Sequence, residues 1–368
     1  MLTTTDGAGA VVADEGVGGA PSHPVRVRTP AGELTFDCRR REPILYAGLR
    51  QGVSLPYACA TGTCGSCRLR GDPAAIALAW PEAPGRAKLK AEHDLLLCQT
   101  LPQRACAIES RSALAPWPAE MPNPDYARGR ITSRCLVGRD VLAFSVALDR
   151  AIDFLPGQFV VIRVPSFPGY RAYSMTNADR ATAELGFVIR RKPDGRLSRW
   201  LFDEDYDGTT IEVFGPLGGA VLAKDEDADL LVIAGSTGIA GPMAILSRAA
   251  ADGLFARRRA DVFFGVRTLA DAFFLDVLAA LAARAPEQLR VTLALSDEEP
   301  AAGRHPAFPA IALAHGDVHA VAGREIGGPR HETLAFLAGP PPMVDAAIRM
   351  LLTRARLPAA AIRYDRFW

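Results

Sequence analysis

The spacing of apolar and polar positions changes along the chain, and these changes predict several folded units. Residues 25–28 and 34–38 are short strand-like runs around a Pro-Ala-Gly turn, and residues 43–49 follow with the spacing of a short amphipathic helix. From about residue 126 the chain consists of short β-type runs interrupted by Pro and Gly, which is typical of a small antiparallel barrel. The strands expected there are residues 129–136, 141–148, 159–164, 185–190 and 209–213.

Beyond residue 229 the strands become continuous apolar runs separated by alanine-rich helical segments. The expected strands are residues 230–234, 261–266, 291–295 and 334–338. Strands that alternate with helices predict a parallel α/β sheet. The fold class is therefore a multidomain α/β and β protein. Its expected parts are a disordered tail at 1–23, a first domain at 24–113, a proline-rich linker at 114–125, a barrel at 126–225 and an α/β domain at 226–368.

Length and charge narrow the classes of function. A chain of 368 residues is too long for one ordinary core, and 42 basic against 41 acidic residues give no global attraction to nucleic acid or to an acidic membrane. The start lacks the features of a secretory signal. The uncharged stretch 230–247 is interrupted by Gly and Pro, so a strand, a turn and a helix start explain it better than a membrane span. We expect a soluble, cytoplasmic monomer with no nucleic-acid or membrane partner.

Seven unevenly placed cysteines argue against a disulfide framework and for a metal site. Cys59, Cys64 and Cys67 have the spacing C-x4-C-x2-C, and 30 residues separate Cys67 from Cys98. A [2Fe–2S] cluster needs four thiolates, whereas a zinc site, the alternative, usually presents two close pairs of ligands. The remaining cysteines fit no ligand spacing and are expected to be small buried residues; they are Cys38, Cys106 and Cys135.

The segment 57–67, together with Leu97-Cys98-Gln99, resembles plant-type ferredoxins. This resemblance implies that the first domain is a β-grasp ferredoxin whose cluster ligands are Cys59, Cys64, Cys67 and Cys98.

The segment Arg171-Ala172-Tyr173-Ser174 resembles the R-x-Y-[ST] motif of the ferredoxin–NADP reductase superfamily, although a strand with a solvent-facing arginine would also explain it alone. The resemblance implies a six-stranded antiparallel flavin-binding β-barrel, with FAD as the cofactor and FMN as the alternative. Tyr173 would lie against the isoalloxazine, Ser174 near its N5 and Arg171 at the pyrophosphate. The resemblance implies a second phosphate-binding element at Gly195, Arg196, Leu197 and Ser198, with a helix that begins at Ser198. It also implies a strand that lines the flavin through Val188, Ile189 and Arg190.

The turn at residues 233–240 follows a buried strand and opens a helix, but it is not G-x-G-x-x-G. It resembles the G-G-T-G-[IL]-A turn of the same superfamily, which implies an α/β nucleotide-binding domain that takes NADH in preference to NADPH. The residues that this resemblance assigns to the nicotinamide nucleotide are Gly235, Ser236, Thr237, Gly238, Gly265, Arg267, Asp271, Gly339, Pro340, Pro341 and Met343. Ala338 stands where the family usually has a cysteine beside the nicotinamide, so we expect slower hydride transfer.

The chain ends in aromatic residues. A frayed end is the general expectation for a terminus, but in this superfamily a near-terminal aromatic ring covers the flavin. The resemblance implies that Phe367, or else Trp368, has this role, and that Ser174, Thr237 and Phe367 are the residues closest to the chemistry.

The order of ferredoxin, flavin barrel and nicotinamide domain resembles the reductase components of bacterial multicomponent oxygenases over residues 24–368. It implies electron flow from NADH through FAD and the cluster to an oxygenase or hydroxylase component, or to its ferredoxin. Residues 80–85 and 361–367 resemble toluene monooxygenase reductases, which favours a soluble di-iron monooxygenase acting on hydrocarbons or aromatics. Residues 215–218 and 264–271 also resemble naphthalene dioxygenase reductase. A Rieske dioxygenase partner, a partnerless diaphorase and a redox sensor therefore stay open as alternatives.

Overall fold

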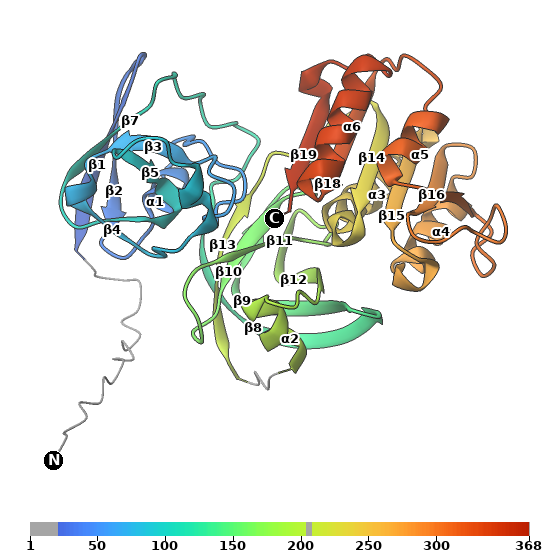
Figure 1. Cartoon of the computed structure of the whole chain (residues 1–368), viewed down its shortest axis with the longest axis horizontal. Coiled ribbons are helices and arrows are strands. Elements are labelled where there is room, and N and C mark those ends of the chain that lie inside the picture. The colour runs from blue at the N-terminus through green and yellow to red at the C-terminus, as the bar shows by residue number, and fades with distance from the viewer. Residues whose placement is uncertain (1–20, 204–207, 368) are drawn as a thin grey trace.

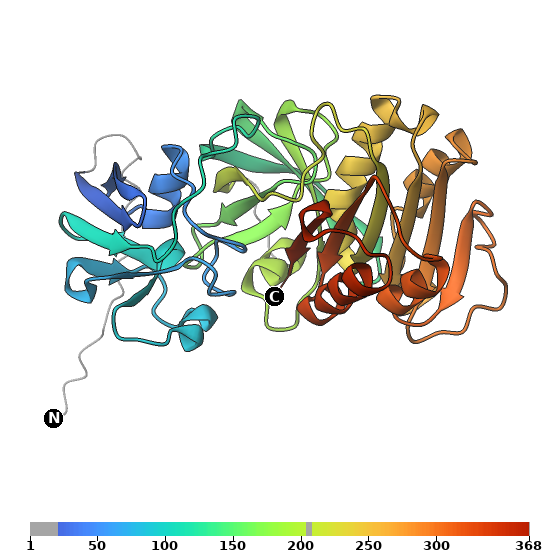
Figure 2. The same ribbon diagram turned by 90° about the horizontal axis from the view of Figure 1, so that it is seen from above.

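The computed structural model describes residues 21–203 and 208–367. Three main sheets lie in a row along the long axis of the molecule (Figure 1). Figure 2 shows the same order from above, with the second sheet between the first and the third. The last strand of the chain, β19 (Ile362–Arg366), lies on the side of the third sheet that faces the second sheet (Figure 1).

The first sheet has five strands in the order β2-β1-β7-β3-β5, and a short helix packs against it. Strands β1 and β7 are parallel, and the other pairs are antiparallel. The helix α1 (Ile44–Arg50) confirms the predicted helix, but it buries six of its seven residues, so it is enclosed on all sides rather than amphipathic. The strands are β1 (Ser22–Thr29), β2 (Gly32–Arg39), β3 (Arg68–Gly71), β5 (Asp94–Leu96) and β7 (Cys106–Glu109), with a separate pair β4 (Ile76–Leu78) and β6 (Thr100–Pro102).

The second sheet is antiparallel throughout and has six strands in the order β11-β10-β13-β8-β9-β12. Its two outermost strands, β11 and β12, approach each other, so the sheet curls as the predicted six-stranded barrel requires. The helix α2 (Arg196–Asp203) follows β12. The strands are β8 (Asp125–Gly138), β9 (Val141–Asp153), β10 (Phe159–Arg163), β11 (Arg171–Ser174), β12 (Ala181–Arg190) and β13 (Thr210–Leu217).

Strand β10 is buried on both faces, although a strand of a small antiparallel barrel normally has one face towards water. Val160 and Ile162 pack into the interior of the barrel. Phe159 and Val161 point the other way and pack with the core of the first sheet. The first two sheets therefore share one hydrophobic core.

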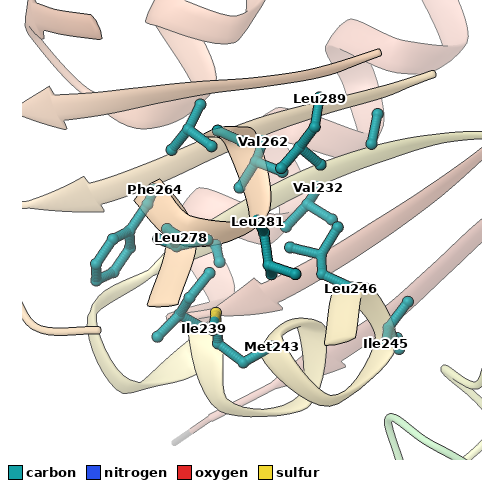
Figure 3. Packing of buried hydrophobic residues seen from close by; sticks show 14 of the residues in the cluster. Val232, Ile239, Met243, Ile245, Leu246, Val262, Phe264, Leu278, Leu281 and Leu289 are labelled. Atoms are coloured by element: carbon teal, nitrogen blue, oxygen red, sulfur yellow. The ribbon is translucent and has the colours of Figure 1, made fainter. Parts of the chain in front are cut away.

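The third sheet is parallel and has six strands in the order β17-β16-β15-β14-β18-β19. Its strands are β14 (Asp229–Gly235), β15 (Ala260–Val266), β16 (Leu289–Leu295), β17 (Ile311–His315), β18 (Thr333–Gly339) and β19 (Ile362–Arg366). Its helices are α3 (Ala240–Ala251), α4 (Leu275–Arg284), α5 (Val318–Glu325) and α6 (Pro341–Thr353). Figure 3 shows one face of its core, where Val232 and Val262 from the strands meet Met243, Leu246 and Leu278 from the helices.

The outermost strands, β17 and β19, are not among the strands expected from the sequence. β17 begins with a short apolar run, Ile311 to Ala314, but two of these residues are alanines, which are poor strand formers, and only Ile311 is fully buried. β19 alternates charged and apolar residues. None of the helices in the described residues is both long and apolar enough to cross a membrane.

Several local predictions need adjustment. Helix α2 begins at Arg196 rather than at Ser198, because the Arg199 N–H already donates to the Gly195 carbonyl at 2.9 Å. Strands β1 and β8 begin at Ser22 and Asp125, slightly before the expected boundaries at 24 and 126. The rest of the expected tail, residues 1–20, lies outside the described residues.

The three cysteines without ligand spacing differ in exposure. Cys38 is buried as expected, and Cys106 is half-buried. Cys135 is exposed, so that prediction is wrong. The physical reason is that residues 132–136 of β8 are exposed on both faces of the strand.

Candidate functional site

The four predicted ligand cysteines lie together as two pairs of thiols. The backbone N–H of Cys64 points at Cys59 Sγ at 3.4 Å, and the N–H of Cys59 points at Cys64 Sγ at 3.5 Å. Cys67 Sγ lies 3.2 Å from Cys98 Sγ. Within the described residues, no group of three His, Cys, Asp or Glu side chains has the arrangement for a single metal ion. Two thiol pairs suit a cluster of two irons better than one zinc ion.

The loop that carries these cysteines is shaped for negatively charged sulfur. The backbone N–H groups of Thr61 and Ser66 point at Cys59 Sγ and Cys64 Sγ, each at 3.4 Å. Gly62 has a φ of +87°, and a Cβ there would lie 2.9 Å from the Gln99 side chain, so the tight loop requires glycine. The hydrogen bond with Cys64 lowers the pKa of the Cys59 thiol, and the same contact raises the pKa of Cys64. The loop thus already stabilises a thiolate, which is the form that binds metal.

A cavity of about 1450 Å³ extends from the cysteine loop across the second sheet to the C-terminal segment. Its lining includes Cys59 and Cys64 of the cysteine loop, Tyr173 and Ser174 of β11, and Phe367 of the C-terminal segment. All three sheets therefore contribute to one site. A volume of this size accommodates a dinucleotide as large as FAD.

Strand β11 carries the predicted flavin motif into this cavity. Ser174 is buried, and Tyr173 is half-buried with its ring edge-on to Phe144 and Phe187 at 6.3 and 6.5 Å. Arg171 donates to the carbonyl oxygen of Tyr170 at 2.9 Å, and burial lowers its pKa. A desolvated guanidinium beside a cavity is a strong attractor for phosphate.

The first turn of α2 supplies a second anion-binding element. The Ser198 hydroxyl accepts from the Lys192 N–H at 3.1 Å and donates to the Gly195 carbonyl at 2.9 Å. This closes the turn so that the helix N-terminus opens on the cavity, where a phosphate is favoured. Arg190 also lines the cavity, and within the described structure its Nε is buried without a hydrogen-bond partner. The orphaned donor indicates a polar group of a bound molecule, so the residues fit FAD.

The glycine turn after β14 packs directly against the turn after β18. A Cβ at Gly235 would lie 2.8 Å from the Met343 sulfur, and a Cβ at Gly238 would collide with the Ala338 carbonyl. Of this turn, Thr237 reaches the cavity. The two turns lie at the carboxyl ends of adjacent parallel strands, where α/β sheets bind nucleotides.

The loop after β15 brings charged groups to the same edge of the sheet. Asp271 accepts from the Thr268 N–H and hydroxyl at 3.2 and 2.9 Å. It lies 3.6 Å from Arg190 of the second sheet and 4.0 Å from Arg267. Burial opposes ionisation of Asp271, but these hydrogen bonds and arginines outweigh it and lower its pKa.

The C-terminal segment runs beside β18 as strand β19 and ends at the cavity. The Phe367 N–H donates to the Gly339 carbonyl at 2.9 Å, which places Phe367 in the cavity lining. Asp365 pairs in register with Ala338, and burial raises its pKa to about 7. Trp368 lies outside the described residues.

The structure places the predicted residues in two adjoining groups. The cavity is lined by Cys59, Cys64, Arg171, Ala172, Tyr173, Ser174, Val188, Ile189, Arg190, Gly195, Arg196, Leu197, Ser198, Thr237 and Phe367. Cys67 and Cys98 are buried behind the loop. The others lie on the third sheet, outside the cavity lining: Gly235, Ser236, Gly238, Gly265, Arg267, Asp271, Gly339, Pro340, Pro341 and Met343.

Among the lining residues that the sequence did not assign to the site are Tyr57, Trp80 and Asp365. The Tyr57 hydroxyl accepts from the N–H of Gly218, which joins the cysteine loop to the second sheet at 3.0 Å. Tyr57 is an aromatic residue in a loop of small residues, and Trp80 is one in a proline-rich loop. Neither feature indicates a contact with Gly218 or Arg171, which are at least 91 residues away in the sequence.

Three family models match in succession along the chain. They are a 2Fe-2S iron-sulfur cluster binding domain at residues 28–103, an oxidoreductase FAD-binding domain at 128–221 and an oxidoreductase NAD-binding domain at 232–349. The ferredoxin–NAD(+) reductase component of the alkene monooxygenase system of Xanthobacter autotrophicus is 33% identical, over 90% of this chain and 98% of that protein. The reductase component of phenol 2-monooxygenase from a Pseudomonas strain is 30% identical, over 92% and 93% of the two chains.

The chain belongs to the reductase components of multicomponent oxygenases. A solved structure with the same architecture is the ferredoxin reductase in carbazole 1,9a-dioxygenase, with a TM-score of 0.78 at 28% identity over 95% of this chain and 100% of that one. The reductase thus has a [2Fe–2S] ferredoxin domain, an FAD-binding domain and an NAD(P)-binding domain. It is an NAD(P)H-dependent oxidoreductase of an oxygenase system, as the predicted order of units implied.

Proposed function

We propose that this reductase takes electrons from NADH and delivers them to the oxygenase component of a soluble di-iron monooxygenase that acts on hydrocarbons or aromatics. The observation that carries the proposal is the single cavity that joins the cysteine loop, the flavin motif and the C-terminal segment. When bound, FAD accepts a two-electron hydride and releases single electrons, which a [2Fe–2S] cluster can accept.

The four paired cysteines are the proposed cluster ligands, with Cys59 and Cys64 on one iron and Cys67 and Cys98 on the other. The thiol pairing and the N–H groups aimed at Cys59 and Cys64 support this assignment. The Cys59–Cys64 pair lines the cavity, whereas Cys67 and Cys98 are buried. The first pair therefore faces the flavin side.

Three elements are proposed to hold FAD. Arg171 and the N-terminus of α2 bind its phosphates, Tyr173 supports the ring, and β12 lines it through Val188, Ile189 and Arg190. Ser174 and Thr237 are proposed to orient the reacting atoms of flavin and nicotinamide, because both line the cavity. Phe367 covers the flavin and must move for the nicotinamide to approach. Its position at the end of β19, held through its backbone N–H, supports that role.

The third sheet is proposed to bind NADH through its two opposed turns. Gly235, Ser236 and Gly238 on one side and Gly339, Pro340, Pro341 and Met343 on the other lie at the carboxyl ends of β14 and β18. Gly265, Arg267 and Asp271 lie at the end of the neighbouring strand β15 and are assigned to the ribose.

Carboxylates beside the ribose loop support NADH over NADPH. Glu298 accepts from the Leu269 N–H at 2.7 Å, two residues after Arg267. The Asp297 N–H donates to the Arg267 carbonyl at 2.9 Å, so the two segments run side by side. Negative charge here disfavours the additional 2′-phosphate of NADPH.

The alkene and phenol monooxygenase reductases among the relatives support the monooxygenase partner. A Rieske dioxygenase is the second candidate, because the carbazole 1,9a-dioxygenase reductase matches over nearly the whole chain. We also propose that the reductase works as a monomer, because a single chain carries the cluster, flavin and nicotinamide motifs.

The test is reduction of a purified partner. The reductase, NADH and either a di-iron hydroxylase or a Rieske oxygenase, each taken from genes adjacent to that of the reductase, are mixed without oxygen. Reduction of the di-iron centre, followed by EPR, is the expected result. Reduction of a Rieske centre alone would replace the proposed partner, and failure of NADH to bleach the visible spectrum would remove the proposal entirely. Sedimentation velocity would test the monomer.

A further inference from the structure

The loop between β4 and β5 of the ferredoxin domain reaches out of that domain to the FAD cavity. Trp80 lies in this loop, is half-buried and lines the cavity. The loop is anchored on the cysteine loop, because the Gly85 N–H donates to the Gly62 carbonyl at 2.7 Å and Lys88 Nζ donates to the Cys64 carbonyl at 3.1 Å. A Cβ at Gly85 would itself lie 2.7 Å from that carbonyl oxygen. The position of Trp80 is therefore set by the cluster-binding part of the molecule.

The partner of Trp80 is Arg171 of the flavin-binding sheet. The guanidinium carbon of Arg171 lies 5.0 Å from the centroid of the Trp80 ring, within the range of a cation–π contact. Gly169 permits this approach, since a Cβ built there would already be 3.2 Å from Arg171 Nη1 and 3.8 Å from Trp80 Cε3. Gly169 also has a φ of +83°, which favours glycine.

Arg171 needs such a support. One of its nitrogens donates to the Tyr170 carbonyl, and within the described residues it forms no ion pair with a carboxylate. A long side chain held by a single hydrogen bond still loses rotamer freedom when a ligand orders it, and this loss weakens binding. An aromatic face under the guanidinium restricts it beforehand and leaves its remaining donors free for a phosphate.

We propose that Trp80 is a positioning residue for Arg171, so that the ferredoxin domain completes the phosphate-binding part of the FAD site. The proposal rests on the assignment of Arg171 to the FAD pyrophosphate made above. It gives the ferredoxin domain a second task besides carrying the cluster, because FAD affinity then depends on a residue on the far side of a domain interface. The competing explanation is that Trp80 only fills space between the two domains.

A flavin without phosphate separates these explanations. The full-length protein is freed of FAD, and binding of FAD and of riboflavin is measured by fluorescence. Trp80→Leu is expected to weaken FAD binding about three- to thirty-fold, the range of a partly desolvated cation–π contact, and to leave riboflavin binding unchanged. Trp80→Phe keeps a weaker aromatic face and is expected to lose about two- to threefold. The matched control is Trp117→Leu: Trp117 lines the same cavity but is hydrogen-bonded to the Met121 carbonyl, so any loss it causes should be equal for FAD and riboflavin.

A double-mutant cycle with Arg171→Gln completes the test. If Trp80 acts through Arg171, Trp80→Leu has no further effect on FAD affinity in the Arg171→Gln background. Equal losses for FAD and riboflavin, or additive losses in the cycle, would overturn the role of Trp80 alone. Unchanged FAD affinity in Arg171→Gln would instead overturn the assignment of Arg171. The visible absorbance of the cluster reports whether each variant is folded. If Trp80→Leu does not fold, the comparison is made with Trp80→Phe.

Discussion

The flavin-binding sheet has two neighbours, and the two interfaces are built differently. Towards the ferredoxin domain the contact is aromatic: Tyr46 stacks on Phe214 with ring centroids 4.4 Å apart, and Tyr126 and Tyr170 pack around this pair. Tyr46 is completely buried, and its hydroxyl donates to the Ala60 carbonyl in the cysteine loop at 2.8 Å. One hydrophobic core thus extends from the barrel to the cluster ligands.

Towards the nicotinamide domain, arginines contribute much of the contact. Arg190 approaches Asp271 at 3.6 Å, Arg180 approaches Asp252 at 3.5 Å, and Arg363 pairs at 3.2 Å with Glu226 in the segment that connects β13 to β14. Some apolar residues, such as Val188 and Leu222, pack there as well. Polar contacts are weaker and more easily rearranged than a shared core. The difference is consistent with the two tasks: electrons cross to the cluster without any opening, whereas a nicotinamide must enter and leave on the other side.

The largest expected effect is loss of the cluster, which lies next to the aromatic interface. Cys98→Ala removes one proposed ligand and is expected to abolish the cluster, because three thiolates leave one iron incompletely held. FAD should still bind and NADH should still reduce it, since Cys98 lies outside the cavity lining. Visible absorbance and EPR measure the cluster, and flavin bleaching measures the rest. The exposed Cys135 offers a matched control, and a fully occupied cluster in Cys98→Ala would refute the ligand set.

The next prediction tests the aromatic interface itself. Tyr46→Ala empties the centre of the shared core and is expected to lower the free energy of unfolding by about 3–5 kcal/mol. Tyr46→Phe removes only the hydrogen bond to Ala60 and should cost about 1 kcal/mol. Urea unfolding, followed by both cluster absorbance and flavin fluorescence, is the measurement.

The control for this experiment is Phe336→Ala, which empties the core of the nicotinamide sheet instead. In that variant the cluster and flavin signals should still be lost at the same urea concentration. If the two signals separate in the unchanged protein, the ferredoxin and flavin domains do not unfold as one unit and the contrast between the interfaces is lost.

Much of this arrangement was predictable from the sequence, because the units carry their own local patterns. All the strands expected in the barrel and the α/β domain are present, since continuous or alternating apolar runs determine them. The cysteine spacing likewise indicated a loop that brings Cys59, Cys64 and Cys67 together with the distant Cys98.

The contacts between units were not predictable. Phe159 and Val161 belong to a strand with an ordinary apolar run, and nothing in that run shows that its second face meets another domain. Tyr57 and Trp80 are single residues whose partners, Gly218 and Arg171, are far away in the sequence. Such pairs arise from tertiary packing, which a periodic pattern does not encode.

Asp365 provides a pH test on the nicotinamide side. Burial raises its pKa to about 7 from an ordinary value of 3.8, so the folded protein prefers the protonated carboxyl. This contribution to stability is complete below pH 4 and is lost as the pH rises towards 7. In protein freed of FAD, the unfolding free energy should therefore fall by about 1–2 kcal/mol over this range, less than full burial would give because Asp365 is only half-buried. Asp365→Asn should flatten the profile, and an equal slope in both proteins would contradict the assignment.

A smaller effect is expected for the arginine contacts of the same interface. Arg363 also donates to the Val221 carbonyl, so Arg363→Gln loses charged hydrogen bonds that are partly exposed. We expect a loss of about 1 kcal/mol that shrinks at high salt, whereas the loss in Tyr46→Ala should not depend on salt. Thermal unfolding at two ionic strengths measures both. If the losses of stability in Arg363→Gln and in Tyr46→Ala are both independent of salt, the proposed difference between the two interfaces is wrong.

The smallest expected change concerns Ala338, at the junction of the nicotinamide turns. Its carbonyl oxygen abuts Gly238 and its backbone lies opposite Asp365, so a side chain at this position lies among the groups proposed to receive the nicotinamide. Ala338→Cys should raise the rate of flavin reduction by NADH about two- to threefold, equivalent to less than about 0.7 kcal/mol in the barrier. Ala338→Ser is the matched control of similar size, and stopped-flow reduction without oxygen is the measurement. Because Ala338 lies on the nicotinamide side, electron passage from flavin to cluster should stay unchanged in both variants. An unchanged rate in Ala338→Cys would show that alanine does not slow hydride transfer here.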